Sequence, residues 1–227
     1  MSLPDAVPGH FIIDLATVAC TDGRPGRILR VMLNAEEFAK TKFDLPEGGR
    51  WSELVAGEVR QFEAPDDTHG TIVLNLTKAL GEHLHSGHDT AAVDEPGQRA
   101  YACYELGLIT CRDPDTVRCP PVSVFIGGEA FAEMDREVTE SRPGLVIELA
   151  TSNQRRAEMA ERVLEWHAWG VTCVWVVNSI DKSVHVAEPG QVVEVRATAE
   201  TLVGPTALAG LEFPVRDLFV EPDWWTR

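Results

Sequence analysis

Two short apolar runs separated by a helical segment are the clearest pattern in the chain. Leu145–Leu149 is apolar except for Glu148, and Val171–Val177 is a second run rich in β-branched residues. Between them, apolar residues recur at helical spacing after capping-type residues, and Gly170 stands where the helix should end. This pattern predicts a strand, a helix and a parallel neighbouring strand joined by a right-handed crossover.

Weaker patterns predict the other elements. Apolar residues at helical spacing predict a short helix over Ala35–Lys42, capped by Asn34, and a longer helix from about His69 to His85. Glu53–Phe62 has the pattern of one strand bent at Gly57. Further strands are predicted within residues 91–111, 117–126, 183–187 and 192–197, and a last strand with a helical turn within residues 211–219.

The chain shows no repeat, linker or low-complexity segment, and 227 residues are enough for one domain with a large core. We therefore predict a single α/β domain over residues 34–221, with a mixed central β-sheet flanked by helices. Residues 1–33 precede it and fit either extra edge strands or a partly ordered arm. Residues 222–227 form a C-terminal tail.

Charge and cysteine content limit the classes of partner. Lysine and arginine number 20 against 36 acidic residues, which gives a formal net charge of −16 and disfavours DNA binding. Five widely spaced cysteines without a CxxC motif indicate reduced thiols. The sequence has neither an 18-residue apolar window nor the start of a signal peptide, so we expect a cytoplasmic protein without a membrane partner.

From Leu33 to Val220, an ordered series of phrases resembles the Uma-two family of restriction-endonuclease-like proteins. The phrases are LNAEEFAKT, RWSELVAGEV, THGTIVLNLTKAL, DTVRCPPVSVF, RPGLVIELATS, ERVLEWHAWGV and GLEFPVRDLF. The resemblance implies the PD-(D/E)XK fold and a metal-dependent DNA endonuclease, a hydrolase that cleaves phosphodiesters with Mg²⁺. It also implies paired subunits, and because exposed edge strands are commonly paired, we expect a homodimer.

The resemblance also assigns the site residues. Glu58 and Glu148 fall on the family's acidic positions and are the candidate metal ligands, although any binding would be weak. Pro121 replaces the aspartate of the PD pair, and Arg162 replaces the lysine of the following helix. Proline offers no side-chain ligand, and arginine stays protonated at neutral pH and cannot act as a base. We therefore expect a weakened or inactive endonuclease, with Mg²⁺ if active and with no cofactor otherwise. The alternative is a catalytically silent interaction or binding module on the same fold.

Several alternatives stay open at the candidate site. Asp113 or Asp115 could replace the missing carboxylate, and Glu53 is a second acid near Glu58. Those two glutamates would lie on opposite faces of a regular strand, unless a bulge intervenes. Glu148 could be only the partner of an arginine from the next helix.

The remaining charged and polar groups also have two interpretations. Arg155, Arg156 and Arg162 could form a phosphate clamp or a solvated helix face with paired glutamates. The histidines His83, His85 and His88 suggest a metal site, but an exposed helix terminus explains them better. His69 could cap its helix or form a hydrogen bond near the site.

Overall fold

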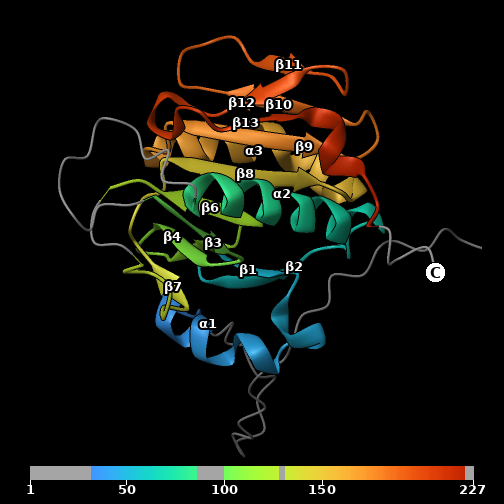
Figure 1. Cartoon of the computed structure of the whole chain (residues 1–227). Coiled ribbons are helices and arrows are strands. Elements are labelled where there is room, and N and C mark those ends of the chain that lie inside the picture. Colours follow the sequence, from blue (N-terminus) through green and yellow to red (C-terminus); the bar gives the residue numbers. More distant parts are fainter. Residues whose placement is uncertain (1–31, 86–99, 128–130, 223–227) are drawn as a thin grey trace, which may run out of the picture.

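The computed structural model describes residues 32–85, 100–127 and 131–222 (Figure 1). Of the predicted arm, only residues 32 and 33 are among the described residues. His88 and the tail after residue 222 lie outside them. The helices are α1 (Ala35–Thr41), α2 (Thr68–His85) and α3 (Asn153–Trp169), and the 3₁₀ turns are η1 (Lys42–Asp44), η2 (Pro46–Gly49), η3 (Thr206–Leu208) and η4 (Val215–Phe219).

The strands form two principal sheets and a two-stranded ribbon. The five-stranded sheet has the order β2-β1-β5-β4-β7, and the six-stranded sheet has the order β11-β10-β9-β8-β6-β3. The strands are β1 (Ser52–Val55), β2 (Glu58–Gln61), β3 (Tyr101–Tyr104), β4 (Gly107–Cys111), β5 (Thr116–Arg118), β6 (Val122–Phe125), β7 (Val138–Thr139), β8 (Leu145–Ala150), β9 (Cys173–Asn178), β10 (Ser183–Ala187), β11 (Glu194–Arg196), β12 (Thr201–Val203) and β13 (Glu212–Pro214). The α/β class with mixed sheets and flanking helices is confirmed, with most of the strands divided between two principal sheets.

The central crossover has the predicted form. β8 and β9 pair in parallel, with Ile147 opposite Trp175, and α3 connects them. Ser152 caps α3 through a hydrogen bond from the Arg155 N–H, and Gly170 ends the helix in the left-handed conformation.

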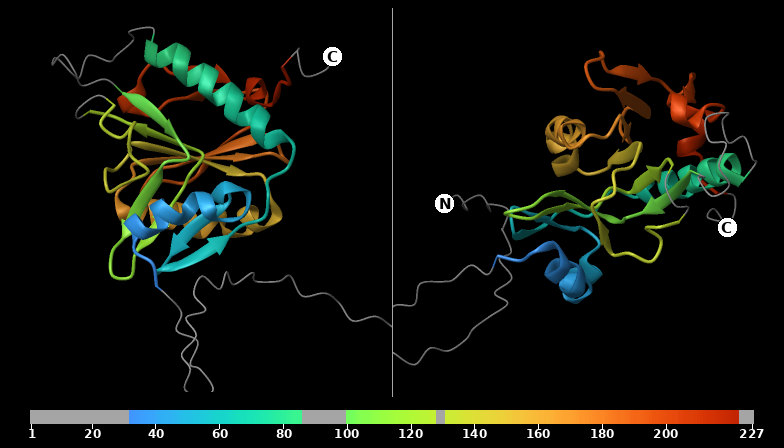
Figure 2. Two further views of the ribbon diagram at one scale, coloured as in Figure 1. Left: turned by 90° about the horizontal axis from the view of Figure 1, so that it is seen from below. Right: turned by 90° about the vertical axis from the view of Figure 1, so that its left-hand side faces the viewer.

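The two faces of the six-stranded sheet are covered by different elements (Figure 2). On one face, α2, η4 and the β12–β13 ribbon pack on the buried side chains of Ile147, Trp175 and Val177. On the other face, α3 packs on Val146 and Val174. Because side chains alternate along a strand, Glu148 lies on the α3 face together with Val146.

The five-stranded sheet has its own small core under α1. Phe38 of α1 packs with Leu54 of β1, Ile109 of β4 and Val117 of β5. Asn34 and Glu37 form the capping box at the start of α1, as the sequence predicts. Glu53 alternates with Leu54 and therefore lies on the opposite face of β1, away from α1.

The prediction of one bent strand over Glu53–Phe62 is wrong. The segment is a hairpin in which Ser52–Val55 and Glu58–Gln61 pair antiparallel around the two-residue turn Ala56–Gly57. Both turn residues have positive φ angles, 50° and 79°, as a tight hairpin turn of this kind requires. The glycine marks a reversal of the chain and not a bulge.

The chain changes sheets at Pro120–Pro121. β5 belongs to the five-stranded sheet, whereas β6 lies in the six-stranded sheet and pairs with β3 and β8. Proline lacks the N–H that a sheet ladder needs, so two consecutive prolines end one strand before the next begins.

None of the helices in the described part of the chain is long and apolar enough to cross a membrane.

Candidate functional site

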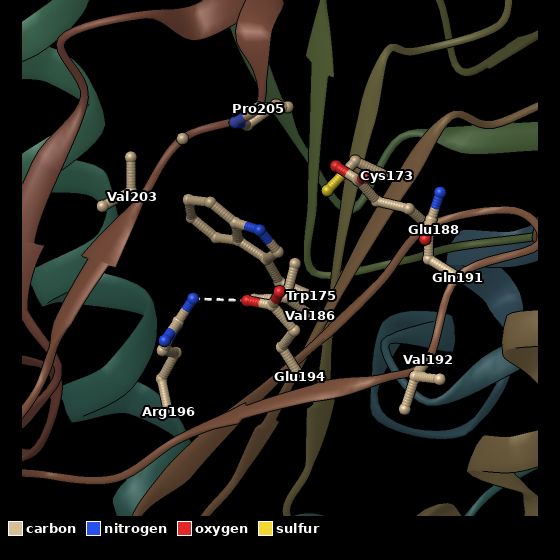
Figure 3. A pocket seen from close by; sticks show the side chains of 11 residues that line it. Cys173, Trp175, Val186, Glu188, Gln191, Val192, Glu194, Arg196, Val203 and Pro205 are labelled. Carbon is tan, nitrogen blue, oxygen red and sulfur yellow. Dashed lines mark hydrogen bonds and ion pairs between the residues drawn. The ribbon is translucent and has the colours of Figure 1, made fainter.

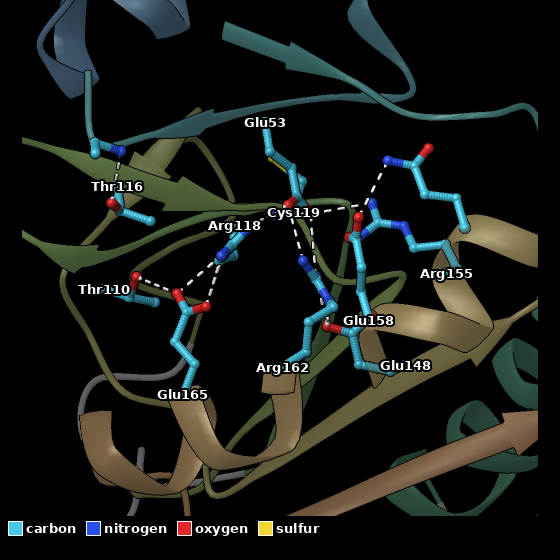
Figure 4. Close-up of polar contacts among 12 residues, drawn as sticks. Glu53, Thr110, Thr116, Arg118, Cys119, Glu148, Arg155, Glu158, Arg162 and Glu165 are labelled. Atoms are coloured by element: carbon cyan, nitrogen blue, oxygen red, sulfur yellow. Dashed lines mark hydrogen bonds and ion pairs between the residues drawn. The ribbon is translucent and has the colours of Figure 1, made fainter. Parts of the chain in front are cut away.

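The two principal sheets meet α3 at a buried cluster of charged side chains (Figure 4). Glu148 reaches it from β8, Glu53 from β1, and Arg162 from the middle of α3. All three side chains are almost fully buried, with residue exposures of 1% for Glu148, 1% for Glu53 and 3% for Arg162. The cluster thus joins three elements that are far apart in the sequence.

The guanidinium of Arg162 bridges the two carboxylates. Its Nη1 and Nη2 donate to Glu53 Oε2 and Oε1 at 2.8 and 3.0 Å, which is a bidentate pair. Its Nε and Nη2 donate to Glu148 Oε1 at 3.0 and 2.6 Å. Trp166, one helical turn further along α3, donates its Nε1–H to the same Glu148 oxygen at 2.8 Å. A single cation therefore occupies the space between the two acids.

Glu53 is also held by two further arginines. Arg118 Nη1 donates to its Oε2 at 3.0 Å and Arg155 Nη2 donates to its Oε1 at 3.1 Å. Arg118 in turn donates Nε and Nη2 to Glu165 of α3. The extended cluster contains three carboxylates, Glu53, Glu148 and Glu165, and three guanidiniums, Arg118, Arg155 and Arg162. Its formal charge is balanced.

The neighbouring charges favour the ionised forms of Glu53 and Arg162. Burial by itself would raise the pKa of Glu53, but the neighbouring charges of Arg162 and Arg155 outweigh it and hold that pKa well below its ordinary range. Burial would likewise lower the pKa of Arg162, yet Glu148 and Glu53 keep it above its ordinary value. Arg162 is thus a permanent cation and cannot accept a proton from water.

Of the three site residues predicted from the sequence, the structure brings Glu148 and Arg162 into direct contact. The acid that joins them from the SELVAGEV segment is Glu53. Glu58 begins β2, and the pairing of Val55 with Glu58 places it on the same face of the hairpin as Glu53 but nearer the turn. The expectation that Glu53 and Glu58 lie on opposite faces is wrong, because the turn at Ala56–Gly57 separates them into two strands.

Pro121 directly precedes β6 and lies next to Glu148 of the neighbouring strand β8. Val122 pairs with Ile147, so the register carried one residue further puts Pro121 opposite Glu148. An aspartate at position 121 would therefore lie next to Glu148, as the family pattern requires.

The two aspartates that could have replaced this carboxylate lie elsewhere. The Asp115 carboxylate accepts a hydrogen bond from the Ala35 N–H at 2.8 Å and so caps the start of α1. It also forms an ion pair with Arg112. Asp113 is exposed in the turn that precedes β5. Neither supplies a ligand beside Glu148.

The arginines of α3 are not a solvated helix face. Arg162 is buried, and Arg155 is mostly buried, with its guanidinium 4.0 Å from the ring centroid of Phe62. Arg156 lies further out and donates to the Ala150 carbonyl at the end of β8. The alternative in which Glu148 pairs with an arginine of the next helix describes the observed contact.

His69 lies near the cluster but is held by other groups. Its Nδ1 is 2.9 Å from the Thr151 hydroxyl, and its ring meets Trp51 edge-on. Burial lowers the pKa of His69 to about 4, so the ring is neutral at physiological pH. At the far end of α2, His85 contacts the Gly81 carbonyl, one turn earlier in the same helix.

The residues at the cluster do not fit the metal of the PD-(D/E)XK fold. Mg²⁺ needs several hard oxygen ligands with uncompensated negative charge. Here both oxygens of Glu53 and Oε1 of Glu148 already accept hydrogen bonds from guanidiniums, and the side chain of Pro121 contributes no ligand. Within the described residues, no group of three or more histidine, cysteine or acidic side chains has the geometry of a metal site.

Two comparisons agree on the relatives of this chain. Residues 35–216 match the model of the Uma2 family, described as "Putative restriction endonuclease". Among solved structures, a "putative nuclease belonging to DUF820" from Anabaena variabilis ATCC 29413 has a similar fold. It is 22% identical, with a TM-score of 0.61, over 82% of this chain and 97% of that one. No curated protein matches the chain.

The structural neighbour shows the fold, and the family match covers the residues that form the cluster, from Glu53 to Glu165. Because the family model spans most of the sequence, the protein belongs to the Uma2 family.

Proposed function

We propose that this chain is a catalytically silent member of its family, in which the former nuclease centre has become a structural clamp. The observation that supports this most directly is the position of Arg162. It lies between Glu53 and Glu148 and donates to both, where an active centre would have a divalent cation. The clamp holds β1, β8 and α3 together at the junction of the sheets.

A lysine at position 162 could not bridge the two carboxylates in the same way. Its single ammonium is a point charge, whereas the planar guanidinium presents donors along two edges and can pair with two carboxylates at once. The replacement of lysine by arginine therefore removes the group that could assist a water molecule and adds one that neutralises both acids. The replacement at Pro121 removes the third potential ligand.

Electrostatics also argue against DNA as the natural partner. The chain carries a formal net charge of −16, and non-specific DNA affinity comes from cations that are free to displace counterions. The arginines of the cluster are already paired with glutamates. We infer that the fold serves association or binding, and that any phosphodiester cleavage is residual.

A plasmid-cleavage assay tests the proposal. The full chain is incubated with supercoiled plasmid in Mg²⁺ and, separately, in Mn²⁺, beside Glu148→Ala. We expect no metal-dependent nicking by either protein. Cleavage by the unaltered chain that is lost in Glu148→Ala would reject the silent interpretation, because it would show that the cluster performs hydrolysis.

The converse experiment asks how far the site has changed. The double variant Pro121→Asp/Arg162→Lys restores the family's residue types at the two altered positions. If only those residues block the site, this variant should bind Mn²⁺ while the unaltered chain does not. The matched control is Arg162→Lys alone, which still lacks the third carboxylate and should not bind.

A further inference from the structure

The outermost strand of the six-stranded sheet, β11 (Glu194–Arg196), is an exposed edge with Val195 at its centre and two further valines just before it. In the described part of the chain no strand pairs with its outer side, and it lies at the periphery of the molecule (Figure 1). Val192 and Val195 are 88% and 53% exposed, and Val193 between them is also exposed.

The side chains of β11 alternate between two distinct faces. Glu194 and Arg196, with Val192 before them, line a pocket of about 470 Å³ between β11 and residues 203–205 (Figure 3). Val193 and Val195 are not among the lining residues and lie on the opposite face, where Val195 pairs with His185 of β10. One face of the edge is therefore charged and the other apolar.

Exposed strand edges with apolar side chains are sites of pairing with another chain, and proteins that avoid such pairing place charges or prolines there. The two charges of β11 do not serve that purpose, because Glu194 and Arg196 have opposite sign and pair with each other within the strand. The edge is thus neutral, extended and open.

The order of residues in β11 is self-complementary. In an antiparallel pair of two copies with Val195 opposite Val195 of the partner subunit, Glu194 lies opposite Arg196 of the partner subunit, and the reverse pair is equivalent. Val193 then faces Ala197 of the partner subunit. A shift of the register by two residues would instead place like charges opposite each other, which is unfavourable. Charge therefore selects one register around one two-fold axis.

We infer that β11 is the interface of a homodimer, in which two copies join their six-stranded sheets edge to edge around Val195. The occupant is a second copy, because an antiparallel copy of the Glu-Val-Arg strand matches both the charges and the valine. This inference does not depend on whether the Glu148 cluster is silent. It gives the homodimer that the family resemblance implies a specific surface.

Sedimentation velocity of the full chain tests the inference at about 50 μM in 150 mM NaCl, where a modest interface is populated and long-range repulsion is screened. The chain should sediment as a dimer of its 24.9 kDa subunit. Val195→Lys puts two ammonium groups on the axis and should weaken dimerisation by at least about tenfold in Kd. The matched control is Val220→Lys, at a valine of similar exposure (55%) beyond η4, which should remain dimeric.

A charge exchange separates this interface from any other. Glu194→Arg and Arg196→Glu should each be monomeric, since each places like charges across the axis. The double variant Glu194→Arg/Arg196→Glu should recover the dimer, and a mixture of the two single variants should form a heterodimer. Thermal unfolding of each variant confirms that it is folded.

The inference is overturned by a monomeric unaltered chain under these conditions. It is equally overturned by a dimer that withstands Val195→Lys, because such a dimer uses another surface. Failure of the mixed single variants to associate would contradict the Val195 register.

Discussion

Arg162 determines the chemistry of the whole charged cluster. It is buried, pairs with Glu53 and Glu148, and helps to hold the pKa of Glu53 well below its ordinary range. A buried ion pair adds little net stability compared with apolar groups, but the loss of one partner leaves a charge without compensation. The residue is therefore more important for what it neutralises than for the energy of its own contacts.

Removal of the Arg162 guanidinium should therefore destabilise the fold. Arg162→Met keeps much of the side-chain volume but leaves two buried carboxylates with fewer partners, and should reduce the free energy of unfolding by about 3–5 kcal/mol. The control is Arg156→Met on the same helix, which breaks more exposed contacts and should cost about 1 kcal/mol. Urea denaturation measures both values, and equal costs would show that Arg162 has no special role.

At the scale of residues, the sequence identifies much of the cluster through its resemblance to the family. That resemblance singles out Glu148, Arg162 and Pro121; the structure pairs Arg162 with Glu148, and the register of β6 on β8, carried one residue further, puts Pro121 opposite Glu148. It selects Glu58 over Glu53, because both acids lie in one short segment and the register depends on the turn between them. The two-residue Ala56–Gly57 sequence between alternating strands was the available signal. For Arg118, by contrast, nothing local indicates a link to Glu165.

At the scale of elements, the central strand–helix–strand unit is predictable because its signals are local. Ser152 starts α3, Gly170 ends it, and the two apolar runs flank it. The division of the strands between two sheets is not predictable in the same way, because it depends on pairing between distant segments. β12 also escapes prediction, since only Leu202 among its three residues is buried.

Alanine substitutions at two helix glycines should change the stability of the fold in opposite directions, because the two glycines differ in backbone conformation. Gly81 lies inside α2 with open space where a Cβ would be, so Gly81→Ala should stabilise the fold by about 0.5–1 kcal/mol. Gly170 has a φ of 109° at the end of α3, so Gly170→Ala should destabilise it by about 1 kcal/mol. Thermal unfolding should move the two midpoints in opposite directions, and a shift of the same sign in both variants would contradict this reading of the backbone.

At the scale of the whole molecule, one cluster connects sheets with otherwise separate cores. The five-stranded sheet packs on α1, and the six-stranded sheet packs on α2 and α3. Glu53 belongs to the first sheet and Glu148 to the second, and Arg162 joins them. The cation that joins the sheets is then part of the chain itself.

Titration of Mn²⁺ into the full chain by calorimetry at pH 7.5 tests this claim most directly. The same titration of Glu148→Ala shows how much of the heat comes from Mn²⁺ binding at the cluster. The account predicts that the two proteins give the same weak, unsaturated signal up to millimolar metal, because Arg162 already neutralises Glu53 and Glu148. Stoichiometric binding by the unaltered chain that disappears in Glu148→Ala would contradict it.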